Sequence, residues 1–158
     1  MTTAETTGTT GTAPAPAPVP TAGTVAVGDR LPELEIPITR TLIVATAIAS
    51  RDYQDVHHDP ELARMRGSRD VFMNILTTNG LVGRFVTDWA GPRAVLRAVR
   101  VRLGAPNYPG DTMTLTGEVT AVADDGLVEV RVRGANGLGD HVTGTVAVRL
   151  AKEEGGES

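Results

Sequence analysis

Apolar and polar residues alternate in four segments of the C-terminal half of the chain. The apolar positions are Val95, Val99, Val101 and Leu103; Met113, Leu115, Val119 and Ala121; Val128, Val130 and Val132; and Val142, Val146, Val148 and Leu150. Threonine, arginine and glutamate fill most positions between them. Because side chains alternate between the two faces of a strand, each segment predicts a strand with one buried and one wet face. Such strands are typical of an antiparallel sheet.

The first half of the chain predicts one long helix. Its apolar positions are Val71, Phe72, Ile75, Leu76, Leu81, Val82, Phe85, Val86 and Trp89. This broad apolar face predicts a helix from Asp70 to Trp89, stopped by Gly91-Pro92. Ile36 to Val44 predicts one more strand, and Thr46 to Arg51 a short helix.

These elements combine most economically in an α+β fold, in which an antiparallel sheet curls around the long helix. The strand edges that remain open predict pairing with a second copy or a related chain.

Composition divides the chain of 158 residues into one domain and two tails. Residues 1–23 are nearly all Thr, Ala, Gly and Pro, with neither a basic start nor a continuous apolar run. This predicts a disordered tail over residues 1–25 and no secretory signal. A single domain over 26–151 and a frayed tail over 152–158 follow.

Several classes of protein are excluded or disfavoured by composition. No stretch is apolar enough to span a bilayer, and a net charge of −4 with scattered arginines argues against nucleic acid as a partner. The chain has no cysteine, which excludes disulfides and thiol catalysis. A cytoplasmic location is favoured.

The stretch from Asp52 to Pro60 carries the candidate chemistry, because it holds two of the three histidines of the chain and three carboxylates. Asp52 and His57 would lie about 140° apart on one continuous helix, so they meet only if a helix ends between them. Asp55 is a reasonable helix breaker. A carboxylate and an imidazole that hold one water between them are suited to adding or removing that water. The residues alone leave a catalytic pair and a structural role equally open.

Other polar residues of this region have plainer interpretations. Asp59 followed by Pro60 predicts a helix N-cap, and Asp55 is expected to be solvated. His58 is expected to support the site, and His141 to be structural or exposed. A metal site at His57-His58-Asp59 is disfavoured because adjacent histidines do not naturally face one ion. No metal or cofactor is expected.

The Asp52–Pro60 stretch resembles the motif of the MaoC-like (R)-specific enoyl-CoA hydratases, Asp-x-Asn-Pro-x-His-x-Asp. The stretch from Ala105 to Thr112 resembles the later Pro-x-x-x-Gly-Asp-Thr element of that family. The resemblance covers roughly residues 30–150 and implies the hot-dog fold, an antiparallel sheet wrapped around a central helix. The similarity is closer to the small MaoC-like subunits of actinobacterial steroid side-chain hydratases. It is carried there by residues 51–59, 74–76, 86–92 and 138–143.

The resemblance implies a role for each site residue. Asp52 and His57 would activate water, and the backbone N–H of Asn74 would bind the thioester oxygen. Gln54 and His58 would give support. The sequence departs from the motif at Gln54, Asp55 and Asn74, where the family has Asn, Pro and Gly.

The substrate and partners implied are an unsaturated acyl-CoA, specifically a steroid with a CoA-thioester side chain, and a second, different MaoC-like subunit. The two chains would form a heterodimer or heterotetramer, and the partner would carry a domain that docks an aldolase. Three alternatives stay open: a non-catalytic subunit that shapes the substrate tunnel, a hot-dog acyl-CoA thioesterase, and a dehydratase working in the opposite direction.

Overall fold

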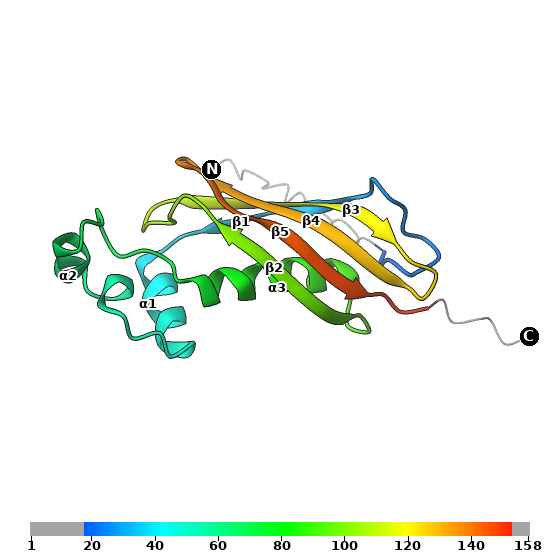
Figure 1. Cartoon of the computed structure of the whole chain (residues 1–158), viewed down its shortest axis with the longest axis horizontal. Coiled ribbons are helices and arrows are strands. Elements are labelled where there is room, and N and C mark those ends of the chain that lie inside the picture. The colour runs from blue at the N-terminus through cyan, green and yellow to red at the C-terminus, as the bar shows by residue number, and fades with distance from the viewer. Residues whose placement is uncertain (1–17, 153–158) are drawn as a thin grey trace, which may run out of the picture.

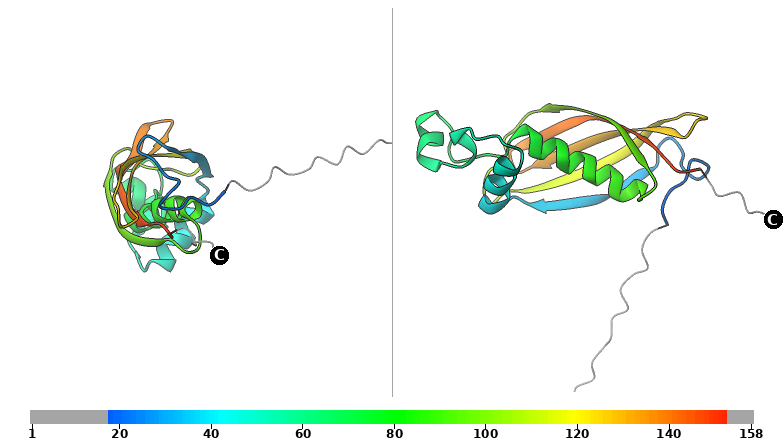
Figure 2. Two further views of the ribbon diagram at one scale, coloured as in Figure 1. Left: turned by 90° about the vertical axis from the view of Figure 1, so that its right-hand side faces the viewer. Right: turned by 90° about the horizontal axis from the view of Figure 1, so that it is seen from below.

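The computed structural model describes residues 18–152 and places a long helix against a curled, five-stranded antiparallel sheet. Across the sheet the order is β1 (Arg30–Pro37), β3 (Thr112–Val122), β4 (Leu127–Asn136), β5 (Gly139–Arg149) and β2 (Val95–Leu103). The helix α3 (Ile75–Ala90) lies along the concave face (Figures 1 and 2). This is the α+β hot-dog arrangement that the sequence predicts.

Close packing of α3 against the sheet depends on small residues in the strands. Val82, Phe85 and Val86 of α3 are buried against the apolar face of the sheet. Opposite Phe85, a Cβ atom on Gly117 of β3 would lie 3.0 Å from the Phe85 ring. Glycine inside a strand marks such a close approach, and here it lets the ring reach the sheet.

The four strands predicted for the second half are all confirmed.

The prediction of a strand over Ile36 to Val44 is wrong. Strand β1 ends at Pro37, and helix α1 (Arg40–Ala49) follows at once. The Thr39 hydroxyl accepts a hydrogen bond from the Leu42 N–H and so caps the helix. Ile43 and Ala47, one turn apart, are the buried residues of α1. The short helix expected over 46–51 is therefore the end of a longer one.

The predicted helix of residues 70–89 begins five residues later, at Ile75. Residues 70–74 are not helical, because their polar groups are used otherwise. The Asp70 carboxylate accepts hydrogen bonds from the backbone N–H of Val71 and from both terminal nitrogens of the Arg40 guanidinium. The hydrogen bonds from Arg40 hold the pKa of the Asp70 carboxyl below its usual value. Asn74 is then the N-cap of α3.

The short elements gather at one end of the sheet, beside the first turn of α3 (Figure 1). They are α1, the 3-10 turn η1 (Asp55–His57) and α2 (Pro60–Met65). Asp59 caps α2 through the N–H groups of Glu61 and Leu62, as predicted.

The predicted tails lie mostly outside the described residues, since 1–17 and 153–158 fall there. The described part of the N-terminal segment, residues 18–25, packs on the domain instead of leaving it. Ala22 donates a backbone hydrogen bond of 3.1 Å to Ala151, and Val25 contacts the core. Between residues 18 and 152, no helix is long and apolar enough to cross a membrane.

Candidate active site

Asp52 and His57 converge at the end of the molecule that holds the first turn of α3. Helix α1 ends at Ala49, and Arg51 adopts a left-handed backbone conformation with φ 58° that turns the chain. The Asp52 N–H then donates to Ala47 O at 2.9 Å. His57 ends the turn η1, and its Nε2 lies 3.4 Å from Asp52 Oδ2. The chain does turn as expected, but the helix ends before Asp52 and not between the two residues, and Asp55, the expected helix breaker, instead begins η1.

The His57 ring is fixed by Phe72 on the other side of the pair. His57 Nδ1 lies 2.7 Å from Phe72 O, and the two rings meet edge to face at 5.0 Å. A carbonyl oxygen only accepts, so Nδ1 carries a proton and a neutral ring presents the lone pair of Nε2 to Asp52.

The pair is shielded but not sealed from solvent. The His57 side chain is 8% exposed and the Asp52 side chain 18% exposed. In a neutral ring, Nε2 and the carboxylate are both acceptors, and one water beside them can donate one hydrogen to each. The geometry thus places two proton acceptors 3.4 Å apart, where a single water can reach both.

Asn74 joins this pair from the start of α3. It is 2% exposed, and its Nδ2 donates to Asp52 Oδ2 at 3.1 Å and to Ser50 Oγ at 3.0 Å. Its Oδ1 accepts from the Thr77 N–H at 2.9 Å. The backbone N–H of Asn74 has no hydrogen-bond partner within residues 18–152. A free amide at a helix N-terminus favours negative charge.

The structure does not bring the side chains of the expected supporting residues onto the pair. Gln54 is exposed, and only its backbone N–H approaches Asp52 Oδ1, at 3.5 Å. His58 is also exposed and turns its Nε2 to Tyr53 O at 3.1 Å. Asp55 forms an ion pair of 2.7 Å with Arg66 and is only 21% exposed, so it is less solvated than expected.

His141 serves a structural network next to the site. It is 2% exposed, with Nδ1 2.7 Å from Ala105 O and Nε2 2.8 Å from the Thr78 hydroxyl. Burial lowers its pKa, so the ring is neutral at pH 7. Nδ1 then donates to Ala105, and Nε2 accepts from Thr78 of α3. This matches the structural interpretation of His141.

Some contributors to the site were not recognised in the sequence. The side chain of Asn74 had a signal, since asparagine before an apolar helix is a favoured N-cap. The carbonyl of Phe72 had none, because any residue type supplies a carbonyl, and nothing in the sequence linked the Ser50 hydroxyl to Asn74. In the described part of the chain, no group of three or more histidine, aspartate or glutamate side chains is placed to hold a metal ion.

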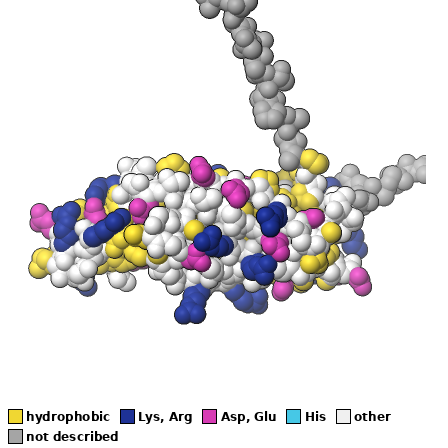
Figure 3. Space-filling model, turned by 90° about the horizontal axis from the view of Figure 1, so that it is seen from above, with side chains coloured by type: hydrophobic (Ala, Val, Ile, Leu, Met, Phe, Trp, Pro, Cys, Tyr) yellow, Lys and Arg dark blue, Asp and Glu magenta, His cyan; other side chains and the backbone are white. Residues whose placement is uncertain are grey.

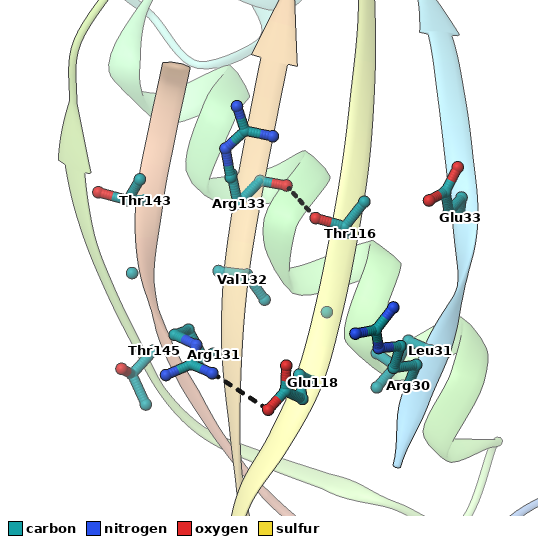
Figure 4. Close-up of a pocket in the computed structure, with 12 residues that line it drawn as sticks. Arg30, Leu31, Glu33, Thr116, Glu118, Arg131, Val132, Arg133, Thr143 and Thr145 are labelled. Carbon is teal, nitrogen blue, oxygen red and sulfur yellow. Dashed lines mark hydrogen bonds and ion pairs between the residues drawn. The ribbon is translucent and has the colours of Figure 1, made fainter. Parts of the chain in front are cut away.

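A large groove lies elsewhere, on the outer face of the sheet (Figure 4). Figure 3 shows basic and acidic side chains intermixed over one face of the molecule. The groove measures about 530 Å³, and its charged residues are Arg30, Glu33, Glu118, Arg131 and Arg133. Arg131 forms an ion pair of 3.1 Å with Glu118 across two strands, and Arg133 pairs with Asp140. Cross-strand charge pairs of this kind are typical of a solvated sheet face.

Comparisons with known proteins agree with this geometry. A beta subunit of 3-oxo-4,17-pregnadiene-20-carboxyl-CoA hydratase from Mycobacterium tuberculosis is 56% identical over 124 residues, or 78% of this chain and 95% of that protein. The crystal structure of the ChsH1-ChsH2 complex from the same organism matches with a TM-score of 0.77 and 56% identity, over 79% of this chain and 98% of that one.

A likeness in fold alone extends further. The unliganded R-hydratase PhaJ1 from Pseudomonas aeruginosa superposes with a TM-score of 0.76 at 21% identity, over 84% of this chain and 86% of that one. The family model described as a MaoC like domain matches residues 23–138. With the hot-dog fold and a relative of 56% identity, this match shows that the chain belongs to the MaoC-like family.

Proposed function

We propose that this chain is the catalytic subunit of an enoyl-CoA hydratase that adds water across the α,β double bond of a steroid side-chain CoA thioester. The observation that carries the proposal is the 3.4 Å approach of His57 Nε2 to Asp52 Oδ2, with His57 Nδ1 held by Phe72 O. The substrate class follows the name of the Mycobacterium tuberculosis subunit, which this chain matches along 95% of its length. Acyl-CoA chemistry is intracellular, and we assign the protein to the cytoplasm on that ground.

In this proposal Asp52 and His57 hold one water, whose oxygen attacks the β-carbon of the enoyl thioester. The new C–O bond forms as one water proton passes to the pair, and the pair returns a proton to the α-carbon. Water is the only co-reactant. General acid–base assistance of this kind typically contributes a factor of about 10² to 10⁴ in rate. The same groups catalyse dehydration in reverse.

The backbone N–H of Asn74 is the proposed donor to the thioester oxygen, which gains charge as the β-carbon is attacked. It points from the N-cap of α3 and has no partner within the described chain. A preorganised donor at a developing oxyanion is typically worth about 3 kcal/mol. The proposal thus assigns the base to Asp52 and His57 and the oxyanion donor to the neighbouring N-cap of α3.

A second, different MaoC-like subunit completes the proposed enzyme. The matched crystal structure from Mycobacterium tuberculosis is that of a ChsH1-ChsH2 complex. Here, strand β2 lies at the edge of the sheet and exposes Val95, Leu96 and Leu103 at 49%, 40% and 36%. Beside the site, Ile75 and Leu76 are 47% and 49% exposed. An unpaired apolar edge strand is a ready template for another chain, and the partner would also close the site over α3.

The test is co-expression with a MaoC-like partner and mass spectrometry of the product made from a steroid enoyl-CoA. We expect a gain of one water, and a fall of about 10²-fold or more in kcat for Asp52→Asn and His57→Ala. Asp55→Asn is the matched control, because that carboxylate pairs with Arg66 instead of His57.

Two outcomes would replace the proposal. Near-normal turnover of both variants in an intact complex makes this chain a scaffold that shapes the substrate tunnel. Release of free CoA without prior hydration makes the protein a thioesterase.

A further inference from the structure

The side chain of Asn74 uses both of its amide hydrogens and its oxygen at the junction of three segments. Its two Nδ2 hydrogens go to Asp52 Oδ2 and Ser50 Oγ, and its Oδ1 accepts from the Thr77 N–H. Ser50 is the C-cap of α1, and Thr77 lies in the first turn of α3. One buried amide therefore ties the end of α1 and the start of α3 to the carboxylate between them.

Only one orientation of this amide fits its partners. A flipped amide would turn its oxygen to the Asp52 carboxylate and its NH₂ group to the Thr77 N–H. Both contacts would then join like groups, acceptor to acceptor and donor to donor. The network thus fixes an NH₂ group against Asp52.

Asp52 has few other restraints. Apart from Asn74 and from His57 at 3.4 Å, its carboxylate has one other hydrogen bond within residues 18–152, from the Gln54 N–H at the long distance of 3.5 Å. Oδ2 is the atom that faces both His57 and Asn74. Without the hydrogen bond from Asn74, the carboxylate could rotate about its terminal torsion, which has broad energy wells.

We infer that Asn74 is a positioning residue, whose side chain holds Asp52 Oδ2 toward His57 and fixes the Asp52 carboxylate relative to the start of α3. The inference rests on the proposed function and adds a role for the side chain to that of the backbone N–H. Because both belong to one residue, the distance between water-binding carboxylate and oxyanion donor is set by a single side chain. Misplacement by about 1 Å can cost about 10²-fold in rate, so such a link has a measurable effect.

Asn74→Ser separates positioning from helix capping. Serine is a good N-cap and keeps the backbone N–H, but its side chain is too short to reach Asp52. In the co-expressed complex we expect kcat to fall by about 10-fold to 100-fold, with KM changed less than about 3-fold. The thermal midpoint should change by only a few degrees. Asn79→Ser is the matched control, since Asn79 lies within α3 and no side-chain hydrogen bond is found for it among the described residues.

Asn74→Asp supplies a second readout that a structural role would not move. Aspartate also caps helices well, but it sets a second carboxylate against Asp52. We expect the midpoint of the acid limb of the kcat–pH profile to move to a higher pH, by about one pH unit or more. The hydration reaction of the wild-type complex is measured first, and its absence refutes the proposed function itself.

If wild-type turnover is present, three results overturn the inference. They are an Asn74→Ser variant with wild-type kcat, an Asn74→Asp variant with an unshifted pH profile, and losses of activity that follow the unfolded fraction alone. Should Asn74→Ser fail to fold, the pH profile of Asn74→Asp decides.

Discussion

Replacing Gly144 with alanine tests how closely the edge strand β2 approaches the sheet. Gly144 lies in β5 opposite Val101 of β2. A Cβ atom added there would lie 2.9 Å from Val101 Cα and closer still to the carbonyl oxygen of Arg100. Both atoms belong to the backbone, so no side-chain rotation relieves the contact.

The expected cost follows from this geometry. Carbon atoms pack at about 3.5 to 4 Å, so β2 must shift away from β5 by about 1 Å. Overpacking typically costs about 1 to 3 kcal/mol, and the strained ladder loses one or two hydrogen bonds of about 1 kcal/mol each. We therefore expect Gly144→Ala to lower the free energy of unfolding by about 4 kcal/mol, which lowers the thermal midpoint by about 15 °C.

Urea unfolding followed by Trp89 fluorescence measures the effect, because Trp89 is the single tryptophan and lies near the end of α3. Gly137→Ala is the control. A Cβ atom at Gly137 meets nothing within 4 Å, so its effect should stay within about 0.5 kcal/mol. Equal stability of the two variants would refute the close approach of β2 to β5.

Two further predictions concern buried polar groups near the site. Burial lowers the pKa of His141 below its usual 6.5, so the unfolded chain takes up a proton before the folded one as the pH falls. The stability that this neutral ring contributes is fully present above about pH 6.5 and declines below it. His141→Gln should therefore make the free energy of unfolding depend less on pH between pH 7 and pH 5. An unchanged slope of that free energy against pH contradicts this. The Thr77 hydroxyl is buried with no partner in the described chain, so Thr77→Val should leave stability unchanged or raise it by up to about 1 kcal/mol. Thr78→Val, which removes a hydrogen bond to His141, should instead cost about 1 to 3 kcal/mol in thermal unfolding. The reverse ranking would show that the Thr77 hydroxyl has a partner.

The two halves of the chain differed in how well their pattern predicted their structure. Strands β3, β4 and β5 were predictable because each has one face against α3 and one in water, which leaves a period of two in the sequence. The region of Thr41, Ile43 and Val44 misled because β-branched residues favour strands. The cap at Thr39 and the burial of Ile43 with Ala47 make it a helix.

The start of α3 was misplaced for a related reason. Val71 and Phe72 extend the apolar pattern of the helix backward, but Val71 is buried from a segment that precedes the helix and is not helical. With the helix start set at Asp70, Asn74 became an interior position, and the role of its side chain was hidden. The residue types of the site were therefore easier to predict than their contacts.

By itself, the sequence determined the α+β architecture and identified Asp52 and His57 as a candidate pair. Strand periodicity is a property of local covalent geometry, and the pair lies within one short turn of chain. Only the tertiary structure decided which nitrogen of His57 faces the carboxylate and which groups hold it. Those decisions rest on Phe72 O, 15 residues from His57, and on Asn74, 22 residues from Asp52. Hydrogen bonds over such separations form only after the whole domain has packed, and no local pattern encodes their directions.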